Sequence, residues 1–168
     1  MGAWPVFRNF LFGLPAGIFF STYVGTFAFV EGRSMQPTLN PDSENEDLVF
    51  LNRLVVRNRN IQRGDIVTFI SPKYPHKIVI KRVIGLSGDV IHTLKYRDPI
   101  LQVPDNYCWV EGDNPTLSLD SNSYGPIPLD TITAKATCIL WPPSRWQSLN
   151  SFIPDSRISV ESPSALAA

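Results

Sequence analysis

Two residues of this sequence, Ser34 and Lys81, have side chains that could act together as a nucleophile and its base. Ser34 lies between an uncharged apolar run and Pro37, a residue that favours a turn. A serine hydroxyl is a poor nucleophile until a nearby base accepts its proton, so it needs a base from another part of the chain. The only histidines, His76 and His92, do not lie in a pattern typical of a Ser-His-Asp triad. A Ser-Lys pair is a known variant of that scheme.

Lys81 lies beside Arg82 in a predicted strand, where successive side chains point to opposite faces. Both faces are apolar, so the pattern alone does not decide which of the two cations is the base. Arginine stays protonated and cannot act as a base, whereas the pKa of a lysine falls readily when burial removes water from its amine. Lowering that pKa from about 10.4 to near 7 requires roughly 4 to 5 kcal/mol against the charged form, which burial can supply. A lysine in a strand is more often an edge charge that prevents aggregation. The chemistry alone does not overturn this reading, and we predict Lys81 as the base because its segment also matches a family pattern that is given below.

The segment before Ser34 is long and apolar. No charged residue occurs over residues 9–30, and about 20 apolar residues are enough to span a bilayer as a helix. A cleaved signal peptide is the alternative, but its apolar core would be shorter and followed by small residues. If residues 26–30 form a strand that leads to Ser34, the helix is limited to about residues 6–24. We therefore predict one transmembrane helix in an N-terminal segment of residues 1–25.

The remainder of the chain predicts an all-β fold of short antiparallel strands. Runs rich in β-branched and aromatic residues alternate with turn signals, at 48–54, 65–70, 77–84, 90–94, 101–103, 108–111 and 131–140. Fifteen prolines and ten glycines fit the many short connections that such a fold needs. We predict a β domain over residues 26–145. The mixture of Ser, Pro and charge over residues 146–168 predicts a mobile C-terminal tail.

Composition excludes several kinds of partner. The 168 residues fit one domain with an anchor, and the formal net charge of zero gives no electrostatic basis for binding nucleic acid. Cys108 and Cys138 form no CxxC motif and have no histidine at ligand spacing, so we predict neither a metal site nor a cofactor. Two buried free thiols and a single disulfide both remain compatible with this pattern.

Several segments, taken in order, resemble the conserved boxes of the type I signal peptidases. The resemblance covers roughly residues 25–140, and the boxes together are far more specific than any one alone. They are Ser34-Met35 with Pro37-Thr38-Leu39, residues 81–85 with Gly88-Asp89, residues 112–114, and Ser118, Asp120 and Ser121. Within the family, residues 122–126 and 139–143 are most similar to the mitochondrial inner-membrane branch.

The resemblance implies roles for further residues. Ser118 would hydrogen-bond the lysine amine, and Asp120 would hold its loop. The family arginine that pairs with this aspartate is Asn122 here, so the partner of Asp120 stays open. Some members have a serine hydroxyl as an oxyanion donor where this chain has Gly32, so the backbone N–H of Ser34 becomes the main expected donor.

The resemblance also implies a function. It implies a serine endopeptidase, anchored in the lipid bilayer of the mitochondrial inner membrane, that removes sorting peptides from presequence-bearing precursors delivered to the intermembrane space. The partner would be a homologous first subunit. An extended substrate segment would bind as an added strand between residues of two strands, namely Phe27, Phe29, Val30, Ile78 and Ile80.

Two alternatives stay open at the level of the sequence. A self-cleaving repressor-type protease uses the same Ser-Lys chemistry, but it would need a DNA-binding region where this chain has its apolar run. A catalytically idle subunit that stabilises a membrane peptidase complex is the other alternative, and only Asn122 in the altered loop favours it.

Overall fold

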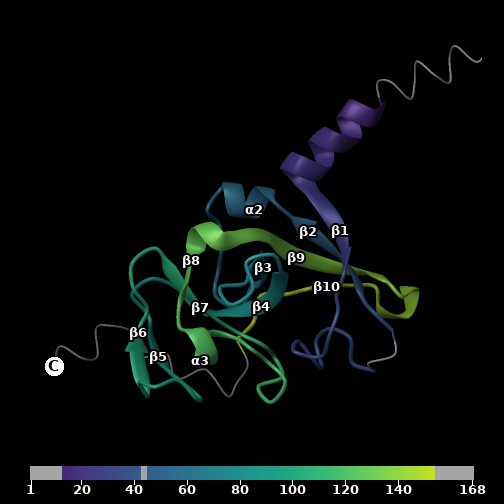
Figure 1. The fold of residues 1–168 in the computed structure, drawn as a ribbon. Helices are drawn as coiled ribbons and strands as arrows, with labels where there is room; N and C mark the ends of the chain where they lie inside the picture. Colours follow the sequence, from purple (N-terminus) through teal and green to yellow (C-terminus); the bar gives the residue numbers. More distant parts are fainter. Residues whose placement is uncertain (1–12, 43–44, 154–168) are drawn as a thin grey trace, which may run out of the picture.

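The computed structural model describes residues 13–42 and 45–153, which form a curled antiparallel sheet with short connections (Figure 1). The strand order is β1-β2-β9-β3-β4-β7-β8, with β10 beside β9. These strands are β1 (Gly25–Phe29), β2 (Leu48–Asn52), β3 (Ile66–Ile70), β4 (Ile78–Gly85), β7 (Tyr107–Glu111), β8 (Ile127–Pro128), β9 (Ile132–Trp141) and β10 (Gln147–Ser148). The predicted all-β class is confirmed for the domain.

The other elements are small. A separate two-stranded sheet pairs β5 (Val90–His92) with β6 (Ile100–Gln102). The helical turns after β1 are the α-helical α2 (Leu54–Arg57) and α3 (Ser121–Tyr124), and the 3₁₀ turns Leu129–Thr131 and Pro143–Arg145. Each is a single turn that connects strands, so the sheet alone supplies the framework of the domain.

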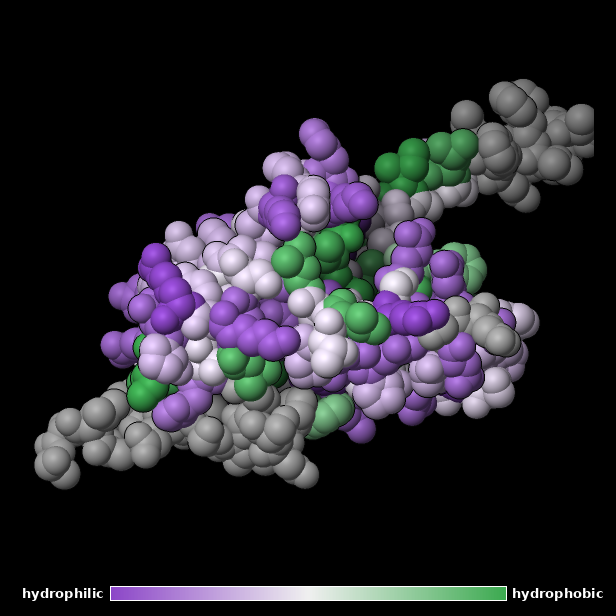
Figure 2. Space-filling view, turned by 60° about the horizontal axis from the view of Figure 1, so that its bottom comes forward, coloured by the Kyte–Doolittle hydropathy of each residue, from purple (hydrophilic) through white to green (hydrophobic). Residues whose placement is uncertain are grey.

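The N-terminal helix projects from the sheet and leads directly into β1 (Figure 1). Residues 13–19 are α-helical, and a wider π-type turn, Phe20–Val24, follows. Its described surface is apolar, with Leu14, Ile18 and Phe19 exposed (Figure 2). Within residues 13–42 and 45–153, no helix has the length and apolar character needed to cross a membrane. The predicted helix of residues 6–24 lies partly outside the described residues.

Two strand edges near Ser34 have no partner strand among residues 13–42 and 45–153. There β1 pairs only with β2, and β4 pairs with β3 along its first half but reaches β7 only from Arg82 onward. Residues 78–80 therefore present one free edge, and β1 presents another. Because the sheet is curled, both edges border the same groove, which is described with the site below.

The apolar core holds both sides of the loop that carries Ser34. Met35 and Leu39 are fully buried and pack with Val30, Val49 and other residues of β2 and β9. Burying a side chain of this size stabilises a fold by about 1.5–3 kcal/mol. Ser34 itself is only half-buried, so the loop is anchored by its neighbours while the hydroxyl remains accessible.

The two cysteines are free thiols, so the disulfide that the sequence allowed is not formed. Cys108 is fully buried in β7 among apolar side chains, and this burial raises the pKa of its thiol to about 12. Cys108 is therefore an unreactive core residue.

The first residues of the predicted C-terminal tail contact the β domain. β10 pairs with β9, Leu149 packs against the core, and the ring of Phe152 lies 4.1 Å from the guanidinium of Arg82. These contacts attach residues 147–152 to the domain. Residues 154–168 lie outside the described residues.

Candidate active site

Ser34 and Lys81 meet although 47 positions separate them in the chain. The Nζ atom of Lys81 lies 2.5 Å from the Oγ atom of Ser34 and also donates to the backbone oxygen of Ile80 at 3.0 Å. Ser34 comes from the loop after β1, and Lys81 comes from β4, which faces that loop across the curled sheet. The structure brings together the two residues that the sequence analysis selected.

The environment of Lys81 lowers the pKa of its amine. Only 4% of the residue is exposed, and burial, the largest cause, brings the pKa from 10.5 to about 8. The carboxylates of Asp120 and Asp113 oppose this shift because they favour the charged amine. The amine can therefore lose its proton near neutral pH, as a general base must.

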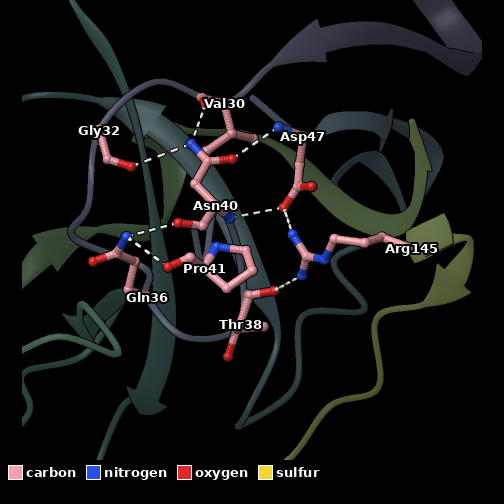
Figure 3. A network of polar contacts seen from close by, with 8 residues as sticks. All are labelled: Val30, Gly32, Gln36, Thr38, Asn40, Pro41, Asp47 and Arg145. Carbon is pink, nitrogen blue, oxygen red and sulfur yellow. Dashed lines mark hydrogen bonds and ion pairs between the residues drawn. The ribbon is translucent and has the colours of Figure 1, made fainter. Parts of the chain in front are cut away.

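A buried network centred on Asn40 fixes the backbone of the Ser34 loop (Figure 3). Asn40 has a positive φ of 52°, and its side-chain amide donates to the backbone oxygens of Val30 and Gly32 on the other side of Ser34. Asn40 and Asp47 also exchange two hydrogen bonds of 2.8 Å between backbone N–H groups and side-chain oxygens. The two ends of the loop are thereby tied together.

Arg145 completes this network from the far end of the sequence. Its guanidinium forms an ion pair with Asp47 and donates to the backbone oxygen of Thr38 at 2.9 Å. Asp47 is almost fully buried, so the pair neutralises a carboxylate that burial would otherwise destabilise. Sequence reasoning missed all three residues, Asn40, Asp47 and Arg145. Positive φ is several-fold enriched at asparagine, but nothing in the chain signals the contact across 98 positions.

We expect Asn40→Ala to lower the cleavage rate about 100-fold and to lower the melting temperature. The change removes the amide that holds Val30 and Gly32, so Ser34 loses its position relative to Lys81, and small displacements of a reacting group are costly. Steady-state cleavage assays and thermal denaturation measure both effects. Asn58→Ala, at an exposed asparagine, is the matched control. Wild-type activity in Asn40→Ala would show that the loop holds its shape without the network.

A groove of about 490 Å³ runs from Ser34 and Lys81 along the two unpaired edges. Four of the five predicted substrate-binding residues line it, namely Phe29, Val30, Ile78 and Ile80. Phe27 does not, which corrects that prediction. Thr26 and Ala28 line the groove as well, whereas the ring of Phe27 lies 5.4 Å from the ring of Phe50.

The chain has close relatives among known proteins. The signal peptidase family, peptidase S26, matches residues 4–98 and 92–141, more than half of the chain. The chain belongs to this family. It is 46% identical to mitochondrial inner membrane protease subunit 2 of Mus musculus over 155 residues, which cover 92% of this chain and 89% of the relative. For the same subunit of Danio rerio the identity is 47%, over 89% of this chain and 82% of the relative.

Membership in the S26 family resolves one alternative. The chain is a serine endopeptidase, and the family match begins at residue 4, within the region where a repressor-type protease would need a DNA-binding domain. The chain is also 42% identical to mitochondrial inner membrane protease subunit 1 of Homo sapiens, over 71% of this chain and 72% of the relative. This chain is therefore similar to both kinds of subunit.

The loop that follows β7 packs directly against the signal peptidase nucleophile loop. The N–H of Asn114 donates to the backbone oxygen of Ser34 at 3.0 Å, and Asp113 holds the buried guanidinium of Arg82 through two bonds of 2.7 and 2.6 Å. A Cβ atom at Gly112 would lie only 2.4 Å from that same oxygen of Ser34. Only glycine permits this approach, so the Gly112-Asp113-Asn114 box is needed to seat the serine.

Ser118 does not form the hydrogen bond with Lys81 that the family resemblance implies. Its Oγ atom is buried against Gly112 and has no hydrogen-bond partner among the described residues. Ser118 nevertheless lies close to the site, because its Oγ atom and the backbone oxygen of Ser34 both approach Gly112. The amine of Lys81 is instead oriented by Ser34 and by the backbone oxygen of Ile80.

The carboxylate of Asp120 has hydrogen-bond donors although Asn122 stands where the family resemblance implies an arginine. Its carboxylate caps α3 by accepting from the N–H of Asn122 at 3.1 Å, and it also accepts from the N–H of Gly112 at 3.0 Å. The side-chain amide of Asn122 bridges Asp120 and Glu111, at 3.2 and 3.0 Å. Asparagine thus replaces an ion pair with neutral donors, and this resolves the question that the sequence left open.

We expect Ser118→Ala to reduce cleavage less than tenfold and to leave the melting temperature unchanged or slightly raised. A buried hydroxyl without a partner costs about 1–3 kcal/mol, so its removal carries no stability penalty beyond a small cavity. Cleavage rates and melting curves of the purified variant provide the measurement. A loss as large as that of Ser34→Ala would mean that Ser118 acts on Lys81 during the reaction.

Proposed function

We propose that this chain is a membrane-anchored Ser-Lys endopeptidase that removes sorting peptides from proteins delivered to the mitochondrial intermembrane space. The observation that supports this most directly is the 2.5 Å contact between Ser34 and a buried lysine of lowered pKa, at one end of a groove bordered by two free strand edges. A catalytically idle subunit would have no need to keep this arrangement.

The reaction proceeds through an acyl-enzyme. Neutral Lys81 accepts the proton of the Ser34 hydroxyl while Oγ attacks the scissile carbonyl, whose oxygen gains the negative charge. The backbone N–H of Ser34 stabilises this oxyanion. The protonated amine of Lys81 then gives its proton to the leaving nitrogen as the C–N bond breaks. A water molecule, deprotonated by Lys81, attacks the ester and releases the second product.

The substrate binds as an extended strand. Among the described residues, no strand pairs with the outer edge of β1 or with the outer edge of residues 78–80, where the Ile80 oxygen accepts only from the Lys81 amine. A peptide that pairs with both edges would gain affinity that does not depend on its sequence. The groove between them is lined by small or branched side chains such as Ala28, Val30 and Ile80, which favour small apolar residues near the cleaved bond.

The relatives support a proposed location and a proposed partner. Proteins named mitochondrial inner membrane protease subunit 2 match over most of their length, which supports an inner-membrane peptidase. A homologous subunit 1 is the proposed partner in a heterodimer. The proposed anchor is a single N-terminal span, with the β domain in the intermembrane space. Protease added to mitoplasts should then degrade the β domain, and protection would refute this orientation.

The proposed function is tested with the purified full-length chain in detergent or lipid and a panel of presequence peptides. Mass spectrometry should detect cleavage at one bond per substrate, after a small residue, without any added metal or nucleotide. The same assay with subunit 1 added shows whether the partner is needed for activity. If no peptide is cleaved alone or with the partner, the chain is the idle subunit that remained as the alternative.

A further inference from the structure

Arg53 is a cation with no partner in the groove. It follows β2 and lines the groove together with Thr26 and Leu51. Its Nε atom is buried without a hydrogen bond, and within residues 13–42 and 45–153 its side chain forms no ion pair. The half-buried Arg145 and fully buried Arg82 each hold a carboxylate. Polar groups of partly buried side chains are usually bonded, so a guanidinium that lines the groove without a partner among the described residues is available to a ligand there.

The position of Arg53 is at the end of the groove away from Ser34. β1 and β2 pair Gly25 with Asn52 and Thr26 with Leu51, so Arg53 lies beside the start of β1, whereas Ser34 follows the end of that strand. From Val30 to Thr26 the strand extends four residues, or about 13 Å at roughly 3.3 Å per residue. A substrate strand parallel to this wall therefore places a side chain near Arg53 about four to six residues from the cleaved bond.

Charge along the groove is uneven. Besides Arg53, the charged residues that line it are Glu31 and Lys81, and both lie at the Ser34 end. Lys81 has to lose its proton in order to act as a base, so Arg53 is the groove's permanent cation. A guanidinium binds a carboxylate more strongly than it binds a neutral carbonyl, because the bonds are charge-assisted and can be bidentate.

We propose that Arg53 is a specificity-determining residue that binds an acidic side chain of the substrate, about four to six residues before the cleaved bond. This inference rests on the proposed function, since it requires that a peptide occupies the groove with its leading segment along β1. Arg53 would give the enzyme a preference for an acidic residue before the cleaved bond, which the apolar side chains near Ser34 cannot provide. The proposed ligand of Arg53 is thus a Glu or Asp side chain of the presequence.

The test uses peptide pairs that differ only by Glu or Gln, with the changed residue placed in turn at about three to seven positions before the cleaved bond. At one or two of these positions, the wild-type enzyme should cleave the Glu peptide with a kcat/KM about tenfold higher, mainly through KM. Arg53→Gln should lose the difference, and Arg53→Glu should prefer a Lys peptide. Arg57→Gln is the matched control, because this neighbouring arginine is exposed and lies over the ring of Tyr23.

The outcomes separate the two proposals. If no peptide is cleaved, the proposed function fails. If the wild type cleaves Glu and Gln peptides equally at every position, the peptidase assignment stands and the role of Arg53 is refuted, without any variant being needed. A preference for Glu that survives in Arg53→Gln, or disappears in Arg57→Gln, also refutes it. Melting curves of each variant confirm that the comparison is made between folded proteins.

Discussion

Ser34→Ala is expected to abolish cleavage, with a fall in kcat of about 10⁴-fold or more. In the part of the chain that the structure describes, the amine of Lys81 contacts the Ser34 hydroxyl and the backbone oxygen of Ile80. The change removes the hydroxyl, which is the one of these two oxygens that can attack a carbonyl. The fold should persist, because the core contacts of this loop are made by Met35 and Leu39. Initial rates of peptide cleavage, read by mass spectrometry beside a melting curve, measure both quantities.

The matched control is Ser87→Ala. The hydroxyl of Ser87 is exposed and donates to the backbone oxygen of Tyr107 at 3.2 Å, on a turn that does not border the groove. Each variant loses one serine hydroxyl, so a difference between their cleavage rates depends on where the hydroxyl lies and not on the loss of a serine as such. Retained cleavage in Ser34→Ala would mean that another group attacks the substrate, and the Ser-Lys assignment would fail.

The pair Ser34 and Lys81 was predictable because both residues lie in segments that resemble the family's boxes, and because chemistry agrees with that choice. The two histidines lie in unsuitable settings and arginine cannot act as a base, which favours a lysine. The strands were predictable for a similar reason, since alternation of apolar residues and turn signals is a local property of the sequence. Their partners were not. That β4 leaves residues 78–80 unpaired depends on where β7 begins to pair with it.

The supporting contacts depend on side-chain direction and long-range packing, which periodicity does not encode. Arg145 reaches Asp47 only because the turn after β9 lies beside the Ser34 loop in the folded sheet. Asp120 finds backbone N–H groups where a side-chain partner was expected, and every non-proline residue offers such a donor. Ser118 lies close to the site, but its hydroxyl lies against Gly112 and forms no hydrogen bond with Lys81.

The altered loop that favoured an idle subunit has a structural explanation. Asn122 accepts from the N–H groups of Leu94 and Lys95, at 2.8 and 3.3 Å, while its amide donates to Asp120 and Glu111. A single arginine could not both donate and accept in this way. The loop is therefore fixed by a different set of bonds, and its departure from the family pattern is no sign of lost activity.

The activity is expected to rise with pH through the ionisation of Lys81. With a pKa of about 8, the neutral amine increases from about one molecule in ten at pH 7 to about nine in ten at pH 9. Only the neutral form can accept the proton of Ser34, so kcat/KM should increase about eightfold to tenfold over this interval and then level off. An ordinary lysine, with its pKa near 10.5, would give a rise that continues beyond pH 9.

Lys81→Arg separates the charge of this position from its function as a base. Arginine keeps a cation of similar length but does not release its proton, so we expect a loss of activity as complete as in Lys81→Met, about 10⁴-fold or more at every pH. Lys81→Met supplies the neutral control of matched length, which tolerates burial beside Val79 and Val83. The rate of each variant is measured from pH 6 to 10 with the peptide that the wild type cleaves best. Substantial cleavage by Lys81→Arg, or a wild-type profile that is flat between pH 7 and 9, would show that this position supplies a positive charge, and the proton of Ser34 would then have to leave by another route.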